Sequence, residues 1–246
     1  MDAVAAPGLA IPRVGKTVVV AVLMGVAIAF IGTVPWIAVI ELNIRERPEW
    51  PWAAMTMGCW LGVLLVWLSG RGWPRRTSAF RQWHLRLWRP EPRAWSGDGL
   101  SAILGFVGAI AGLSVMYVLI GASRPPVDVS AYSIALRWSS LLMSPTVAGV
   151  VEEMAYRGYM QSHLERVGPT FAILATSVVF TLAHATQGLT YMLTLGPGIF
   201  LVSILYGYLA QKAGSIVPGM VLHVAGDLAF MYFVLTGGNA ALLFTK

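Results

Sequence analysis

Charged residues and cysteines are scarce in this sequence of 246 residues. Only 11% of its residues are charged and 57% are hydrophobic, whereas a soluble domain has about 25% charged residues. The mean hydropathy is +0.70. The single cysteine, Cys59, lies inside an apolar run and excludes an internal disulfide. These deficits exclude a soluble globular domain and predict an integral membrane protein.

Several sequence signatures of intramembrane chemistry are also missing. No HExxH motif occurs, which excludes the helical zincin arrangement. Asp227 is preceded by Ala-Gly and does not form GxGD, and no second aspartate lies inside an apolar run, so an aspartyl dyad is disfavoured. No serine has a GxSxG elbow around it. The chain also has no internal repeat or heptad pattern.

Apolar runs of about 20 residues recur along the chain, as transmembrane helices require. We therefore predict an all-α, polytopic transmembrane bundle of about seven to eight membrane helices. The predicted spans are 16–41, 52–70, 99–121, 170–187, 191–211 and 216–235. Residues 133–143 are too few to cross alone, and Ser144-Pro145 predicts the N-cap and first turn of a new helix of about 22 residues. Gly196-Pro197-Gly198 predicts a break in the span 191–211. We divide the chain into N-terminal helices with a basic loop, 1–132, and a helical core, 133–246.

The formal charge of +6 comes mainly from the loop between Arg71 and Asp98, which holds seven arginines. Four tryptophans are interleaved with these arginines, a composition that suits the lipid headgroup region, so we expect an interfacial helix there. The positive-inside rule then places this loop and the N-terminus in the cytoplasm. We expect an integral protein of a bacterial plasma membrane, in contact with the bilayer and not with nucleic acid.

The segment VVEEMAYRGYMQ, from Val150 to Gln161, places ionisable groups among apolar residues. Such groups are costly at membrane depth, about 2.5–3.5 kcal/mol each on insertion scales, and usually have a function. Glu153 and Arg157 are four positions apart and can pair on one helix face. Glu152 is rotated by about 100° from Glu153 and has no cation nearby in the sequence. We therefore predict one neutralised carboxylate, Glu153, and one free carboxylate, Glu152.

Two histidines lie inside apolar spans. His184 ends FTLAH one turn after Phe180, and His223 opens HVAGD one turn before Asp227. Two imidazoles and one or two carboxylates match the ligands of a catalytic zinc. They equally suit a glutamate general base with histidines beside the developing oxyanion. If both helices begin on the cytoplasmic side, the two histidines differ in depth by about 10 Å at 1.5 Å per residue. Helix tilt, or a re-entrant turn at Gly196-Pro197-Gly198, would reconcile the two depths.

Three motifs together resemble the CPBP family of intramembrane proteases, also called the CAAX protease and bacteriocin-processing or Abi family, to which the eukaryotic CAAX prenyl endopeptidase is related. EEMAYR matches EExxxR, FTLAH matches FxxxH, and HVAGD matches HxxxN/D, in the family's order. The resemblance covers roughly residues 133–235. It implies proteolysis of membrane-associated proteins or peptides by a glutamate-activated water.

Carried over to this chain, the resemblance implies that Glu152 is the general base. His184 and His223 would position the water or stabilise the oxyanion. Asp227 stands where Asn is most frequent in the family, which slightly favours a metal because Asp is the better cation ligand. Glu153 and Arg157 would form a structural pair. We expect no cofactor, with zinc as the alternative.

Two further functions compete with proteolysis. An ion- or proton-coupled transporter could use the same intramembrane carboxylates and histidines. Such transporters usually have two similar halves, and this sequence shows no internal symmetry. A membrane scaffold, in which the polar residues only join helices, is the third alternative.

Overall fold

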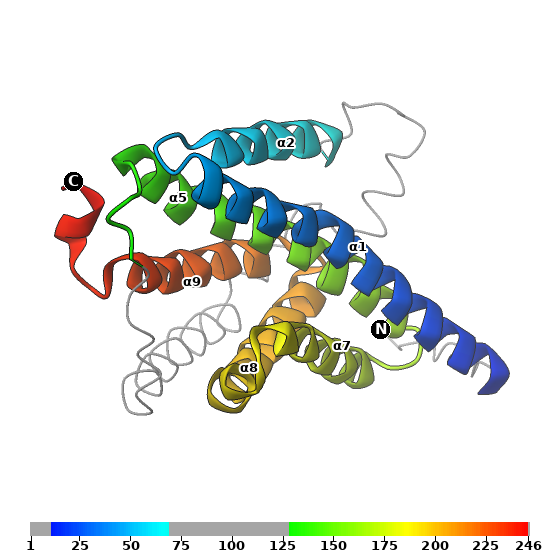
Figure 1. The fold of residues 1–246 in the computed structure, drawn as a ribbon. Coiled ribbons are helices and arrows are strands. Elements are labelled where there is room, and N and C mark those ends of the chain that lie inside the picture. The colour runs from blue at the N-terminus through cyan, green and yellow to red at the C-terminus, as the bar shows by residue number, and fades with distance from the viewer. Residues whose placement is uncertain (1–10, 69–127, 246) are drawn as a thin grey trace.

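The computed structural model describes residues 11–68 and 128–245, and all regular elements in these ranges are helices (Figure 1). Five of the described helices are long and apolar enough to cross a membrane. The structure confirms the predicted all-α membrane bundle for these ranges. The predicted span 99–121 and the basic loop lie outside the described residues, and the division at residue 132 stays a prediction. The helices, in chain order, are α1 (Ile11–Glu46), α2 (Trp52–Leu68), α5 (Ile134–Glu152), the π-helix η3 (Glu153–Gln161), α6 (Ser162–Leu164), α7 (Pro169–Ala183), the 3-10 turn η4 (His184–Gln187), α8 (Leu189–Ala213), α9 (Val217–Thr236) and the 3-10 turn η5 (Ala240–Leu243).

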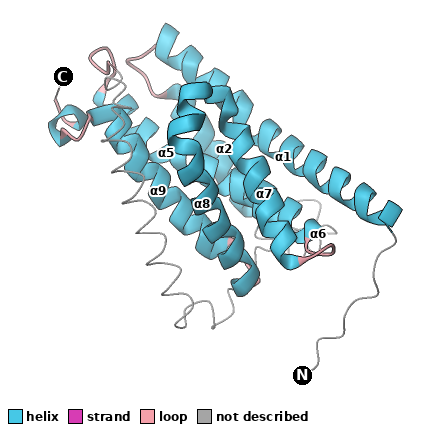
Figure 2. Cartoon of the chain, turned by 90° about the horizontal axis from the view of Figure 1, so that it is seen from below, coloured by secondary structure: helices cyan, strands magenta, loops and turns pink. Residues whose placement is uncertain are grey.

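Helix α5 and its continuation η3 form the centre of the described bundle. They contact α1 and α2 on one side and α9 on another, and η3 also contacts α7 and α8. Figure 1 shows α5 between α1 and α9, and Figure 2 shows α8 beside α9, which it contacts. Because five helices surround this segment, polar side chains of η3 are shielded from lipid.

The helix that carries EExxxR starts earlier than the sequence predicts. Ser133 is its N-cap and accepts a hydrogen bond from the backbone N–H of Leu136 at 3.1 Å. The helix then continues through Pro145, so the predicted start at Ser144-Pro145 is wrong. The predicted break at Gly196-Pro197-Gly198 is also wrong, because α8 runs through Pro197. Prolines are tolerated inside membrane helices where neighbouring helices and local adjustments compensate the lost hydrogen bond.

Small residues let the surrounding helices approach this central segment closely. A Cβ atom added at Gly32 of α1 would lie 2.4 Å from Val151, and one at Gly149 would lie 2.7 Å from Val224 of α9. No real Cβ makes contacts this short, so both crossings need glycine. This packing through small residues is typical of membrane helices, which gain little from the hydrophobic effect against each other.

The outward faces of the helices remain apolar. Leu23 and Phe30 of α1 are 64% and 60% exposed, and Val63 of α2 is 71% exposed. Many exposed large apolar side chains of this kind are typical of a membrane-facing surface. The burial pattern thus agrees with the hydropathy of the five candidate spans.

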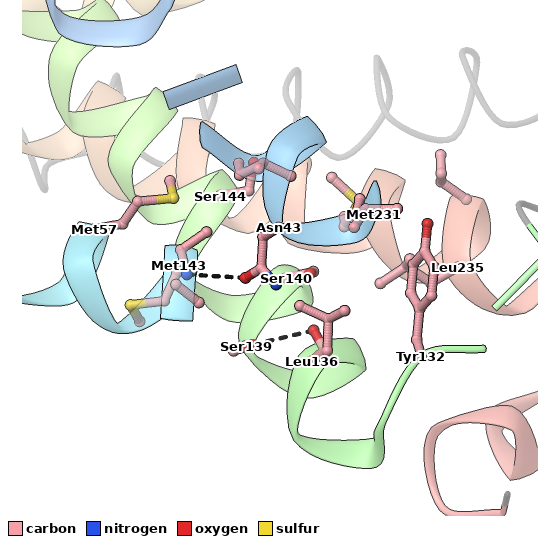
Figure 3. Close-up of a pocket in the computed structure, with 15 residues that line it drawn as sticks. Asn43, Met57, Tyr132, Leu136, Ser139, Ser140, Met143, Ser144, Met231 and Leu235 are labelled. Atoms are coloured by element: carbon pink, nitrogen blue, oxygen red, sulfur yellow. Dashed lines mark hydrogen bonds between the residues drawn. The ribbon is translucent and has the colours of Figure 1, made fainter. Parts of the chain in front are cut away.

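A cavity of about 170 Å³ lies where α1 ends and α2 begins (Figure 3). Buried Asn43 shapes this end of the bundle. Its amide donates to the carbonyl oxygens of Arg47 and Trp50, at 2.7 and 2.8 Å, and its oxygen accepts from the N–H of Ala53 at 2.9 Å. Asn43 therefore fixes the turn between α1 and α2. The cavity is lined by Ile40, Asn43, Ile44, Ala53, Ala54, Met57, Tyr132, Leu136, Ser139, Ser140, Met143, Ser144, Met231, Val234 and Leu235.

Candidate active site

The predicted pair between Glu153 and Arg157 is present at the centre of the bundle. Arg157 Nη1 donates to Glu153 Oε1 at 2.8 Å, and both side chains are fully buried. Arg157 Nη2 donates to Oγ and the backbone oxygen of Ser203 in α8, at 2.7 and 3.2 Å. Its guanidinium carbon lies 4.5 Å from the ring centroid of Phe180 and 5.2 Å from that of Tyr206. The buried cation is therefore balanced by one carboxylate and enclosed by two aromatic rings.

The type of helix changes between the two adjacent glutamates. Glu152 is the last residue of α5, and Glu153 is the first residue of the π-helix η3. π-Helical segments are rare and occur frequently at functional sites. The polar contacts of η3 continue one turn beyond Arg157, where Gln161 Nε2 donates to the backbone oxygen of Gly207 at 2.8 Å. The segment that carries EExxxR is thus fixed to α8 by side chains.

His223 of α9 lies against both glutamates and Asp227. Its Nδ1 is 2.9 Å from Glu153 Oε1, and since a carboxylate oxygen accepts, Nδ1 donates. Its Nε2 lies 3.7 Å from Glu152 Oε2 and 3.5 Å from Asp227 Oδ2. Glu153 Oε1 consequently accepts hydrogen bonds from both Arg157 and His223. On the other side of the ring, Nε2 of His223 lies near two carboxylates, but neither is within close hydrogen-bond distance.

The three carboxylates differ in how far their side chains are exposed. The side chain of Glu153 is 0% exposed, that of Glu152 is 20% exposed, and that of Asp227 is 38% exposed. No lysine or arginine of the described ranges pairs with Glu152, in contrast to Glu153. Glu152 and Asp227 are therefore the carboxylates that water or a substrate can reach.

His184 joins this group through Phe180. His184 lies at the C-terminal end of α7, and its Nδ1 is 2.9 Å from the backbone oxygen of Phe180. A carbonyl oxygen only accepts, so Nδ1 carries the hydrogen and a neutral His184 has its lone pair on Nε2. The Phe180 ring contacts His184 and His223, with ring centroids 4.9 and 5.8 Å apart.

The expected difference in depth between His184 and His223 is absent, since both contact one ring. All seven residues singled out in the sequence thus lie in one connected cluster, and their chemical roles stay predictions.

Two residues of α8 in this cluster are not predicted from the sequence. Tyr206 stacks on His223, with ring centroids 5.0 Å apart and planes 20° apart, and Ser203 accepts from Arg157. Both contacts join residues far apart in the chain. The sequence holds one weak indication of the contact between η3 and α8. Arg157 and Gln161 are polar residues four positions apart, and Ser203 and Gly207 are small residues at the same spacing.

Potential metal ligands occur in this site. Across residues 11–68 and 128–245, no group of three or more His, Cys, Asp or Glu side chains is arranged to hold a metal ion. Imidazoles and carboxylates are suitable zinc ligands, and the donation of Nδ1–H of His223 and His184 to protein oxygens leaves Nε2 as the ligand atom of each ring. The expectation of no cofactor, with zinc as the alternative, stays a prediction.

Comparison with known proteins agrees with this site. Residues 134–229 match the family model described as Type II CAAX prenyl endopeptidase Rce1-like. The matched segment runs from the start of α5 into α9 and contains all seven residues of the cluster. No curated protein and no solved structure gives a significant match to the chain.

Proposed function

We propose that this chain, whose residues 134–229 match the model of Rce1-like type II CAAX prenyl endopeptidases, cleaves peptide bonds with a water molecule activated by Glu152. The family supports an intramembrane endopeptidase in general. The transporter alternative is not favoured by this match. The proposed substrates are membrane-associated proteins or peptides, and the proposed location is a bacterial plasma membrane with the N-terminus in the cytoplasm.

The observation that carries the proposal is the division between the adjacent glutamates. Glu153 is fully buried and bound by Arg157 and His223. Glu152 is partly exposed and has an imidazole within 3.7 Å. A general base must be in reach of water and must not already be neutralised by a permanent cation. Glu152 meets both conditions, and Glu153 meets neither.

The proposed reaction starts with a proton transfer. Glu152 takes a proton from water while the water oxygen forms a bond to the carbonyl carbon of the scissile peptide. The lone pair on Nε2 of His184 can hold this water in place. Electron density moves to the carbonyl oxygen, which becomes an oxyanion in a tetrahedral intermediate.

His223 is the proposed donor to that oxyanion. Because its Nδ1–H is used by Glu153, His223 donates from Nε2 only when both ring nitrogens carry a proton. Asp227 on the Nε2 side, and Glu152 until it takes the proton from water, compensate the resulting positive charge. Protonated Glu152 then gives its proton to the leaving nitrogen as the C–N bond breaks, which yields a carboxylate and an amine. A hydrogen-bond donor to the oxyanion, the proposed role of His223, contributes about 10²–10³-fold to the rate in well-studied enzymes.

The proposal is tested with purified protein in lipid nanodiscs and a library of peptides, including prenylated ones, analysed by mass spectrometry. Defined cleavage products that are absent with Glu152→Gln support it. Parallel reconstitution in liposomes measures ion flux. Flux that depends on Glu152, without cleavage of any peptide, would replace the protease by a transporter.

A further inference from the structure

The orientation of the His223 ring needs more than its one close hydrogen bond. The bond from Nδ1 to Glu153 holds one edge of the imidazole at 2.9 Å. The ring can still turn about its Cβ–Cγ bond within the tolerance of this hydrogen bond, and such a turn would move Nε2 away from Glu152 and Asp227. The contacts on the faces of the ring therefore decide where Nε2 points.

Tyr206 covers one face of this imidazole. The two rings are nearly parallel, at 20°, with centroids 5.0 Å apart, which lies within the favourable range for stacked aromatic pairs. Phe180 meets the imidazole edge-on, at 79° and 5.8 Å. A stacked ring restricts tilt in a way that an aliphatic side chain of similar size does not, because its flat face matches the imidazole plane.

Tyr206 is itself held in place. It is 3% exposed, and the Arg157 guanidinium lies 5.2 Å from its ring centroid. Ser203, three residues earlier on α8, accepts from the same guanidinium. Arg157 thus fixes Glu153 on one side of His223 and Tyr206 on its face.

We propose that Tyr206 is a positioning residue, whose ring keeps Nε2 of His223 directed between Glu152 and Asp227. The inference rests on the proposed function, in which Nε2 of His223 meets the oxyanion. An interaction made only in the transition state affects kcat and not the binding of substrate. Loss of the ring should therefore lower kcat, by about 10- to 100-fold for a displacement near 1 Å, with little change in KM.

Three variants of Tyr206 and one matched control test this. Tyr206→Phe keeps the stacked ring, whereas Tyr206→Leu and Tyr206→Met remove it. Tyr156→Leu is the control, because Tyr156 is equally buried at 3% and contacts the Phe180 ring at 5.1 Å. Within the described residues Tyr206 stacks on His223, whereas Tyr156 meets Phe180 edge-on. All proteins are compared by kcat, KM, thermal midpoint and nitrogen-15 NMR of labelled histidines.

The NMR measurement does not depend on activity. The chain has four histidines, so His223→Gln identifies the two ring-nitrogen signals of His223. We expect Tyr206→Phe to keep these signals and to keep kcat within about 3-fold of the parent. Tyr206→Leu and Tyr206→Met should shift the His223 signals and lose kcat, while Tyr156→Leu lowers the thermal midpoint without shifting them.

The outcomes separate the two proposals. If the parent protein cleaves no peptide, the proposed function fails, and the NMR signals alone test the position of His223. If the parent cleaves and a folded ring-less variant keeps both the His223 signals and kcat, Tyr206 does not position His223. Equal shifts in Tyr156→Leu and Tyr206→Leu would also overturn the inference, because they would show a general loosening of the core.

Discussion

Replacing Glu153 by Gln should destabilise the folded protein strongly. The amide keeps the shape of the side chain and one acceptor oxygen, but it removes the charge that balances Arg157, which is fully buried. Loss of one partner of a buried ion pair costs roughly 3–5 kcal/mol. Ser203 and the two aromatic rings still contact Arg157, so we expect the lower end of this range.

The expected loss is large enough to measure by thermal unfolding in detergent. For proteins of 150–250 residues, 1 kcal/mol shifts the midpoint by about 2–4 °C, so about 3 kcal/mol corresponds to a fall of roughly 6–12 °C. Glu152→Gln is the matched control, because Glu152 is partly exposed and has no described arginine or lysine partner. Its midpoint should stay within about 2 °C of the parent.

A double substitution shows whether the unpaired charge is the cause. Glu153→Gln with Arg157→Met removes both charges. The double variant should lose less stability than the sum of the losses of the two single variants. Coupling energies between contacting residues are about 0.5–3 kcal/mol, and we expect the upper half of this range. Strictly additive losses would refute the account of Glu153 and Arg157 as a mutually neutralising pair.

Three shorter predictions concern the metal, the topology and the packing of the site. Chelators should leave cleavage unchanged and metal analysis should find no stoichiometric zinc; zinc whose removal abolishes cleavage would overturn the glutamate-only mechanism. A reporter fused after Arg89 should behave as cytoplasmic, because the arginine-rich loop resists translocation, and periplasmic behaviour would invert the topology. Gly219→Ala would place a methyl group 3.3 Å from Glu153 Oε2 and 3.6 Å from the backbone oxygen of Tyr206. It should lower activity and the thermal midpoint relative to Gly62→Ala, whose added carbon meets no atom within 4 Å, and equal behaviour of the two variants would contradict the tight packing.

Local patterns in the sequence predict those features that depend on near neighbours. Apolar runs predict the helices, and α2 and α9 begin within one residue of the predicted positions. Spacing by four predicts the contact of Glu153 with Arg157, at 2.8 Å, and that of His223 with Asp227, at 3.5 Å. These pairs follow from helical geometry alone.

Features that depend on distant contacts are not predicted. Pro145 lies within a continuous helix because surrounding helices support that helix, which no local pattern around Ser144-Pro145 reveals. The stacking of Tyr206 on His223 joins α8 to α9 and has no counterpart in sequence spacing. The π-helix that begins at Glu153 is likewise hidden, since its residues fit an α-helical pattern.

The most direct test of the proposed chemistry is the cleavage rate of Glu152→Gln, measured on a substrate found with the parent protein. Glutamine keeps the size and hydrogen bonding of Glu152 but cannot take a proton from water. The account predicts a loss of about 10²–10⁴-fold in kcat, with the parent's thermal midpoint retained. A folded Glu152→Gln protein that cleaves at the parent's rate would contradict the assignment of Glu152 as the base.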